Sequence, residues 1–350
     1  MRQEDYVNDA IELLRQLIAT PSVSRDEKAA ADIMQRRMTA YGLAPRRDGN
    51  NVWALSPFWD DSKPTLLLNA HIDTVKPVSS WTRDPFEPTL EGDRLYGLGS
   101  NDCGGGLTTL VQVFRWLSLR PQPYNYVYLA SAEEEVSGKE GFSRALPLLP
   151  KIDVAIVGEP TGMQPAIAEK GLMVLDVIAH GKSGHAARNE GVNAIYEALD
   201  DMVWIKDYKF KKMSELLGPT KMTLTVVNAG TQHNVVPDCC KMLVDVRTNE
   251  HYTNEEVYDI IKANVKSEVH AHSFRLHSSH IPTDHPLVKR CVELGLKPYG
   301  SPTLSDQALM PWPSFKLGPG ESARSHSANE FICLSEMRDA FSTYQKLLQP

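Results

Sequence analysis

Histidines and carboxylates stand directly after apolar stretches at several places in this 350-residue sequence. The motif His71-Ile72-Asp73 follows the apolar run 66–69. Residues two apart on an extended segment point to the same side. The Asp73 carboxylate can therefore accept a hydrogen bond from one ring nitrogen of His71 and leave the other nitrogen for a metal ion. Taken alone, such a motif is more often a simple turn at the end of a strand.

An acidic residue also lies inside the glycine-rich segment 97–106, just before a predicted helix. Glycines let the backbone pass close to a bound group. A phosphate-binding loop would carry a Lys-Ser/Thr pair after its glycines, and this segment has none. Asp102 would also repel a phosphate. The segment therefore favours a cation, and a plain capped turn is the alternative.

Three further stretches place acids or a histidine after predicted strands. Glu133, Glu134 and Glu135 follow the apolar run 126–130, and adjacent carboxylates repel one another unless a cation or solvent relieves them. Glu159 follows the run 154–157, and His326 lies in a turn-rich stretch after 315–317. Each of these is unremarkable alone, and a solvated acidic loop is the usual explanation of a charge run.

Together the motifs carry more information than any one of them. Ligands of open α/β sheets bind in the crevice at the carboxyl ends of the strands, and a histidine or acid follows nearly every strand that we predict. Imidazole nitrogens and carboxylate oxygens suit divalent ions such as zinc. The sequence therefore predicts a pair of metal ions at this edge of a sheet.

The helices and strands that position these residues can be predicted from the spacing of apolar residues in the sequence. Helices are predicted over 4–19, 26–41, 104–118, 139–146 and 335–348, and buried strands over 51–55, 65–69, 126–130, 154–157 and 315–317. Strands that alternate with helices indicate an α/β sheet covered on both faces.

A different order begins near residue 171. It predicts strand 172–179, helix 192–207, strands 222–227 and 241–246, helix 254–267 and strand 273–277. This βαββαβ order is typical of a ferredoxin-like domain. We therefore predict a discontinuous catalytic α/β domain, 1–170 and 281–350, that carries an inserted domain over 171–280.

Composition excludes several classes of protein. The net charge is −7 with no basic run, which argues against a nucleic-acid partner. No stretch of 18 apolar residues predicts a membrane span, and the N-terminus lacks the pattern of a secretory signal. The five cysteines form no C-x-x-C pair and are odd in number, so a disulfide framework is not indicated. We expect the cytoplasm as the compartment.

With these motifs in hand, the chain resembles the M20 metallopeptidases, the family of acetylornithine deacetylase, succinyl-diaminopimelate desuccinylase and carboxypeptidase G2, over essentially its whole length. The resemblance implies a zinc-exopeptidase-like mixed sheet flanked by helices, with an inserted ferredoxin-like lid and dimerisation domain. It implies that His71 and Glu135 are terminal metal ligands and that Asp102 bridges two ions. Glu159 and His326 would complete the two coordination shells.

The resemblance also implies roles for residues that bind no metal. Asp73 would orient His71, and Glu134 would be the general base. His185, in the segment 181–187, matches a lid histidine that reaches the substrate carbonyl oxygen of the other subunit, which implies a homodimer. Asn234 and Arg247 match positions that contact the substrate carboxylate, where an arginine can pair both oxygens.

One segment departs from the family pattern. The family commonly has Asp-Met-Lys-Gly-Gly where this chain has Asp102-Cys103-Gly104-Gly105-Gly106, so Gly104 replaces the lysine. This puts details on the substrate side in doubt but leaves the bridging aspartate intact. We interpret Cys103 as a packing residue, since no histidine or base lies near it in the sequence.

The segment 101–106 most resembles the acetylornithine deacetylase branch. We therefore expect an amidohydrolase that holds two zinc ions, with cobalt as the alternative metal. Its substrate would be an α-N-acetyl or α-N-succinyl derivative of ornithine, citrulline or lysine, in arginine or lysine biosynthesis. Arg324 and Lys182 are candidate cations for a succinyl group. The alternatives are a succinyl-diaminopimelate desuccinylase, a di- or tripeptidase, and a non-catalytic binding protein, which should have lost a ligand or the base.

Overall fold

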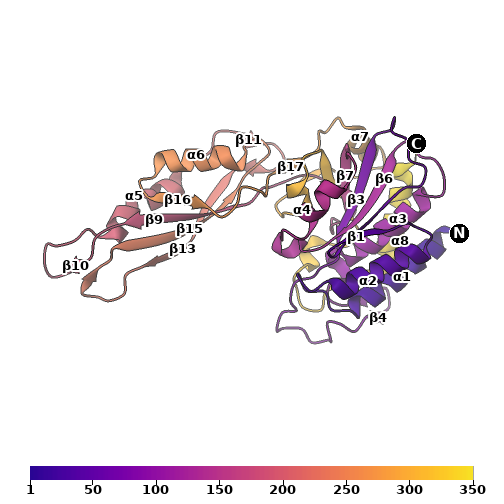
Figure 1. The fold of residues 1–350 in the computed structure, drawn as a ribbon, viewed down its shortest axis with the longest axis horizontal. Coiled ribbons are helices and arrows are strands. Elements are labelled where there is room, and N and C mark those ends of the chain that lie inside the picture. The colour runs from indigo at the N-terminus through magenta and orange to yellow at the C-terminus, as the bar shows by residue number, and fades with distance from the viewer. Residues whose placement is uncertain (350) are drawn as a thin grey trace. The chain divides into compact units, whose positions relative to one another are not determined.

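The computed structural model describes residues 1–349, and the chain divides into two compact units (Figure 1). The first unit comprises Met1–Ile167, Ile281–Tyr299 and the chain from Ser305 onward. The second comprises Ala168–His280 and Gly300–Leu304. Residues 300–304, which the sequence predicted in the catalytic domain, thus group with the second unit in the structure. Within the second unit, Gly300 packs so closely on Leu216 that a Cβ at Gly300 would lie 2.3 Å from the Leu216 carbonyl oxygen.

The first unit is built on a mixed sheet with the strand order β1-β2-β6-β3-β7-β19-β8. Strands β6, β3, β7 and β19 run parallel, so their carboxyl ends meet at one edge. The bounds of these strands are β1 (Arg46–Asp48), β2 (Asn51–Leu55), β3 (Thr65–His71), β6 (Asn125–Ser131), β7 (Val154–Val157), β8 (Ala166–Glu169) and β19 (Ser314–Lys316). A smaller antiparallel sheet comprises β4 (Thr89–Glu91), β5 (Arg94–Tyr96) and β20 (Phe331–Cys333).

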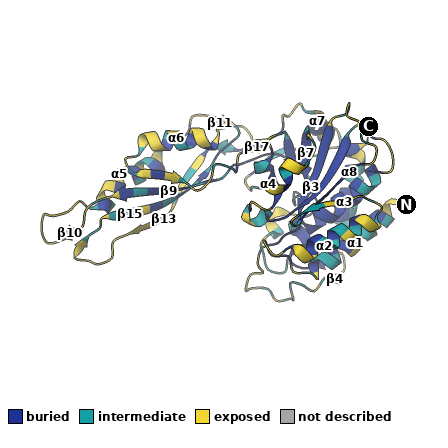
Figure 2. Cartoon of the chain, viewed as in Figure 1, coloured by how far each residue is buried: buried dark blue, intermediate teal, exposed yellow. Residues whose placement is uncertain are grey.

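Helices cover both faces of the mixed sheet, as the alternation of its strands requires. Its strands are the dark blue centre of this unit in Figure 2, and exposed residues lie on the outer sides of the helices. Successive side chains of a strand point to opposite faces. Leu66 and Leu68 join one apolar cluster, whereas Leu67 joins another, with Phe142 and Ala145. The helices are α1 (Gln3–Ile18), α2 (Lys28–Ala40), α3 (Gly105–Leu117), α4 (Phe142–Ala145), α7 (Pro286–Glu293) and α8 (Leu334–Leu348).

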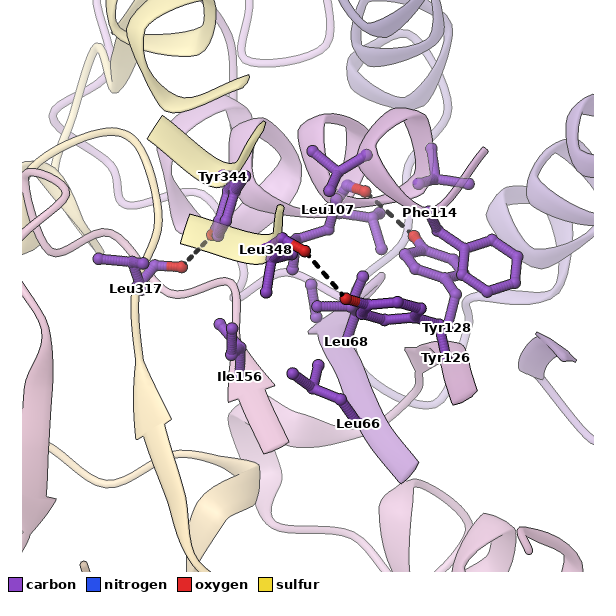
Figure 3. Packing of buried hydrophobic residues seen from close by; sticks show 14 of the residues in the cluster. Leu66, Leu68, Leu107, Phe114, Tyr126, Tyr128, Ile156, Leu317, Tyr344 and Leu348 are labelled. Atoms are coloured by element: carbon purple, nitrogen blue, oxygen red, sulfur yellow. Dashed lines mark hydrogen bonds between the residues drawn. The ribbon is translucent and has the colours of Figure 1, made fainter. Parts of the chain in front are cut away.

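Three tyrosines attach helices to the sheet within the first of these clusters (Figure 3). Tyr128 donates its hydroxyl hydrogen to the Leu107 carbonyl of α3 at 3.0 Å, and Tyr126 donates to the Leu348 carbonyl at 3.4 Å. Tyr344 of α8 donates to the carbonyl of Leu317, next to β19. A buried hydroxyl without a partner is costly, so these bonds favour one arrangement of α3 and α8 over others.

The second unit has a four-stranded antiparallel sheet with the order β13-β15-β9-β16. In chain order its main elements are β9, α5, β13, β15, α6 and β16, which is a βαββαβ arrangement. Their bounds are β9 (Met173–His180), α5 (Ala194–Asp207), β13 (Lys221–Ala229), β15 (Cys239–Arg247), α6 (Asn254–Asn264) and β16 (Glu268–Ala271). Short strands complete the chain, namely β10 (Gly184–His185), β11 (Met213–Ser214), β12 (Gly218–Pro219), β14 (Val235–Val236), β17 (Ser279–His280) and β18 (Tyr299–Ser301).

Some helices and strands begin or end at other residues than the sequence predicted. The last strand of the inserted domain was predicted over 273–277 but is Glu268–Ala271, because α6 ends at Asn264 rather than at residue 267. The predicted helix 139–146 is only Phe142–Ala145 followed by a tighter turn.

Within residues 1–349, none of the helices combines the length and the apolar character that a membrane span requires.

Candidate metal centre

The first side chains of the site lie at the end of β3. His71 is the last residue of this buried strand, and its Nδ1 lies 2.9 Å from the backbone carbonyl oxygen of Asp73. The Asp73 carboxylate, which we expected as that partner, is farther from Nδ1, at 3.5 Å. A carbonyl fixes the ring as well as a carboxylate does, since Nδ1–H donates to it and Nε2 is left without a proton. His71 therefore presents Nε2 to the site.

The Asp73 carboxylate instead connects β3 to the end of β6. Its Oδ1 accepts the backbone N–H of Glu134 at 3.1 Å, and its Oδ2 accepts that of Glu135 at 3.2 Å. Ser24 donates to the same Oδ2 at 2.7 Å. Asp73 is almost fully buried, so these donors replace the water that a carboxylate would otherwise need. The Asp73 carboxylate thus holds Glu134 and Glu135 beside His71.

Asp102 is positioned by a carboxylate to which the sequence analysis assigned no role. Glu330 is buried and accepts the backbone N–H groups of Gly99 at 3.1 Å and of Asn101 and Asp102 at 2.8 Å each. These bonds fix the irregular turn Ser100–Gly104, which precedes α3. Glu330 was visible in the sequence beside His326, but only the fold shows that it lies against residues some 230 positions earlier.

Glu159 reaches the same region from the end of β7. A side chain at Gly106 of α3 would meet the Gly158 carbonyl oxygen at 1.7 Å, so only glycine lets this helix approach the β7 end so closely. The Glu159 Oε1 then lies 3.8 Å from His71 Nε2. This oxygen is shielded from solvent and accepts no hydrogen bond within the described chain.

Asp102 lies between two groups of donors. Its Oδ1 is 3.3 Å from His71 Nε2, and its Oδ2 is 3.6 Å from His326 Nε2. His326 Nε2 in turn lies 2.8 Å from Glu135 Oε2. His71 therefore has Glu159 nearby and His326 has Glu135, while donor atoms of His71, Asp102 and Glu135 also lie within 4.8 Å of one another. Glu134 also faces this cluster, with its Oε2 4.0 Å from His71 Nε2.

The charges of this cluster call for a cation. Burial raises the pKa of Glu159 to about 8 and that of Glu134 well above its usual range, because both carboxylates are shielded from water. The hydrogen bond to Glu135 raises the pKa of His326 to about 9. Crowded, poorly solvated carboxylates with an unpartnered oxygen are the donor set that divalent ions occupy. The residues thus fit a pair of divalent ions.

Cys103 lies closer to these groups than its position in the sequence indicated. The thiol is buried, and its Sγ accepts the backbone N–H of His71 at 3.2 Å. Burial raises the pKa of this thiol, which disfavours a free thiolate nucleophile. Gly104, which stands where the family has lysine, could not carry a side chain here, since its Cβ would lie 2.4 Å from the Gly99 carbonyl oxygen.

In the second unit, His185 and Asn234 are neighbours. His185 pairs with Val235 across β10 and β14, and Ala186 donates its N–H to the Asn234 carbonyl at 3.0 Å. Arg247 lies at the far end of β15, eight residues beyond Cys239, or roughly 25 Å away at the rise of a β-strand. Its guanidinium binds both oxygens of Asp245, at 2.9 and 3.1 Å. The fold therefore separates Arg247 from His185 and Asn234 within one chain.

The two candidate cations for a succinyl group, Arg324 and Lys182, differ in their contacts and in their exposure to solvent. Arg324 donates to both oxygens of Glu336, at 2.8 and 2.9 Å, and its guanidinium lies over the Phe331 ring. It is thus held as a structural ion pair within the first unit. Lys182 is exposed, in the segment that leads to His185.

Known proteins resemble the chain over nearly its whole length. The sequence pattern of "Peptidase family M20/M25/M40" matches residues 67–349. The acetylornithine deacetylase of Proteus mirabilis is 30% identical over 357 aligned positions, which cover 92% of this chain and 91% of that protein. The acetylornithine deacetylase of Salmonella typhimurium is 29% identical, with 92% of each chain covered.

Solved structures agree in fold. The aminopeptidase PepT of Bacillus cereus matches with a TM-score of 0.77 at 18% identity and covers 99% of this chain and 98% of its own. YXEP of Bacillus subtilis, described as a dinuclear metal-binding peptidase of family M20, matches with a TM-score of 0.74 at 17% identity, covering 99% and 98%. Because the family pattern spans most of the sequence and curated relatives reach 30% identity, this chain belongs to peptidase family M20/M25/M40.

Proposed function

We propose that the protein is a dinuclear zinc amidohydrolase that removes the acyl group from the α-nitrogen of an amino acid. The observation that carries the proposal is the position of Asp102, whose two oxygens face His71 on one side and His326 on the other. A carboxylate in this position can bridge two ions, with Glu159 and Glu135 completing their shells. Cobalt is the alternative metal, since N/O ligands also suit it.

The roles of the chain's own residues follow from where they lie. Two bound divalent ions would supply an acidified water and polarise the scissile carbonyl. Glu134 faces this position without being needed as a ligand, so it would take the proton of the attacking water and deliver it to the leaving amine. Asp73 would hold the His71 ring through its carbonyl oxygen and the Glu134 backbone through its carboxylate.

N-acetylornithine is the first candidate substrate. The curated relatives at 26 to 30% identity are named acetylornithine deacetylases. Arg324, one of two cations considered for a succinyl group, is already paired with Glu336, which favours an acetyl group. Such a reaction would belong to amino-acid biosynthesis in the cytoplasm.

We further propose a homodimer formed through the second unit. His185 and Asn234 can act on the same substrate as Arg247 only if the two ends of the unit come from different chains. Strand β15 begins at Cys239, five residues after Asn234, and carries Arg247 roughly 25 Å away from that end. His185 of the partner subunit would then stabilise the oxyanion. The surface for such a contact is available, since α5 and the edge strand β13 expose apolar side chains, namely Tyr196, Leu199, Val203, Val226 and Val227.

The function is tested by a product assay. The zinc-loaded protein is incubated with acetyl and succinyl derivatives of ornithine, citrulline, lysine and diaminopimelate, and with di- and tripeptides, and free amines are quantified. We expect N-acetylornithine to give the highest kcat/KM. Turnover of peptides alone would reject the deacetylase assignment, and no turnover of any substrate at two zinc ions per chain would favour a binding protein.

Glu134→Gln should lower kcat by about 10²- to 10⁴-fold, because the amide cannot accept the proton of water. Two metal ions per chain should remain by elemental analysis, since Glu134 is not needed as a ligand. Glu140→Gln, the same change on an exposed side chain six residues later, should leave kcat unchanged. Near-normal turnover by the Glu134 variant would show that another group is the base.

Glu330→Gln should loosen the metal centre without unfolding the unit. The amide nitrogen that replaces one oxygen would face an N–H donor of the turn Ser100–Gly104, which shifts Asp102. Metal affinity should fall about 10- to 100-fold, the usual cost of losing a group that orients a ligand. Competition with a chelator measures this, with Glu293→Gln on the surface of α7 as the control. Unchanged affinity would mean that Asp102 holds its position without Glu330.

The combined change Leu199→Asp and Val203→Asp should produce a monomer, because it puts two charges on the apolar face of α5. Analytical ultracentrifugation should then give the mass of one chain, and kcat should fall because His185 of the partner subunit is missing. Leu119→Asp, an exposed leucine of the first unit, should leave the dimer intact. A wild-type protein that is fully active as a monomer contradicts the proposal.

A further inference from the structure

Cys103 stands among the donors of the proposed metal centre. Its Sγ, a ring nitrogen of His71 and a carboxylate oxygen of Glu159 all lie within 4.8 Å of one another. The side chain is 1% exposed, so water does not compete for these groups.

The sulfur contacts both backbone groups of His71: its S–H can donate to the carbonyl oxygen at 3.5 Å, and a thiolate bound to a cation would give up only this long contact. The backbone N–H of His71 points at Sγ from 3.2 Å, and hydrogen bonds of this kind stabilise charge on sulfur. Glu159 Oε1, a second donor of the group, is shielded from solvent and accepts no hydrogen bond within the described residues. A histidine, a cysteine and a carboxylate are three ligand types that zinc accepts together.

We propose that Cys103 binds, as a thiolate, the ion held by His71 and Glu159. This inference rests on the dinuclear centre proposed above. When the ion binds, the S–H bond breaks, a sulfur–metal bond forms, and the proton passes to solvent. One site is then a nitrogen, sulfur and oxygen site, while the site of His326 and Glu135 has nitrogen and oxygen donors alone. A thiolate favours zinc or cobalt over manganese or magnesium, so the first site should fill first with the softer metals.

The proposal is tested by titrating the metal-free protein with Co²⁺ and recording its absorption spectrum. A cobalt–thiolate bond gives a charge-transfer band in the near ultraviolet, whereas N/O ligation gives only weaker bands in the visible. We expect the near-ultraviolet band to grow with the first equivalent of cobalt and to stop there. Cys103→Ser and Cys103→Ala should abolish it and should lower the affinity for that equivalent by about tenfold or more.

A matched control is available at Cys333, in the same unit. It is half-buried at the start of α8, where its side chain already accepts from the helix backbone, and serine is a favourable residue there. Cys333→Ser should leave both the band and the affinity unchanged.

The outcomes separate the two proposals. Binding of two cobalt ions with visible bands but no near-ultraviolet band would overturn the thiolate ligand and leave the dinuclear centre standing. The same holds if Cys103→Ser retains the band. A protein that binds no cobalt would overturn both. Loss of the band in Cys103→Ala, with weaker binding of the first equivalent and two ions still bound at high cobalt concentration, supports both.

Discussion

The buried carboxylate of Asp73 connects the two strand ends that supply most of the candidate site. Strands β3 and β6 run parallel, so His71 and Glu134 arrive at the same edge, but parallel pairing ends at Ser131. Beyond that point the hydrogen bonds to Asp73 hold the backbone of Glu134 and Glu135. Burial alone would raise the pKa of Asp73, yet its partners, with His71 first among them, lower it, so the carboxylate stays charged where it is needed.

The other candidate ligands are also positioned through contacts to their backbone rather than to their side chains. Glu330 takes three N–H groups of the turn that carries Asp102, and the glycine at position 106 lets α3 pack on the peptide before Glu159. Ligands on a fixed backbone lose little entropy when an ion binds, and they can be packed closely although they repel one another. Burial raises the pKa of Glu159 to about 8, and the nearby Asp102 carboxylate adds to the increase.

In the second unit, residues that are proposed to bind the substrate lie far apart. Its βαββαβ topology places the strand end that carries Arg247 far from the short pair β10 and β14, which carries His185. A small amino-acid substrate cannot span one such unit. The same unit exposes apolar side chains on α5 and on the edge strand β13, and isolated domains usually avoid an exposed apolar edge strand. Both observations support the proposed symmetric pair of chains.

The sequence by itself determined the class of fold, and it predicted the two-part organisation and the types of metal ligand, because strand periodicity is local and most of the predicted ligands follow a strand. It could not determine how the ligands divide between two ions, since this depends on which oxygen of Asp102 faces which histidine. It also missed Glu330 as the anchor of the turn and the proximity of Cys103 to His71, and it set the last strand of the inserted domain five residues too late. These features arise from packing between segments far apart in the chain, and no local pattern records them.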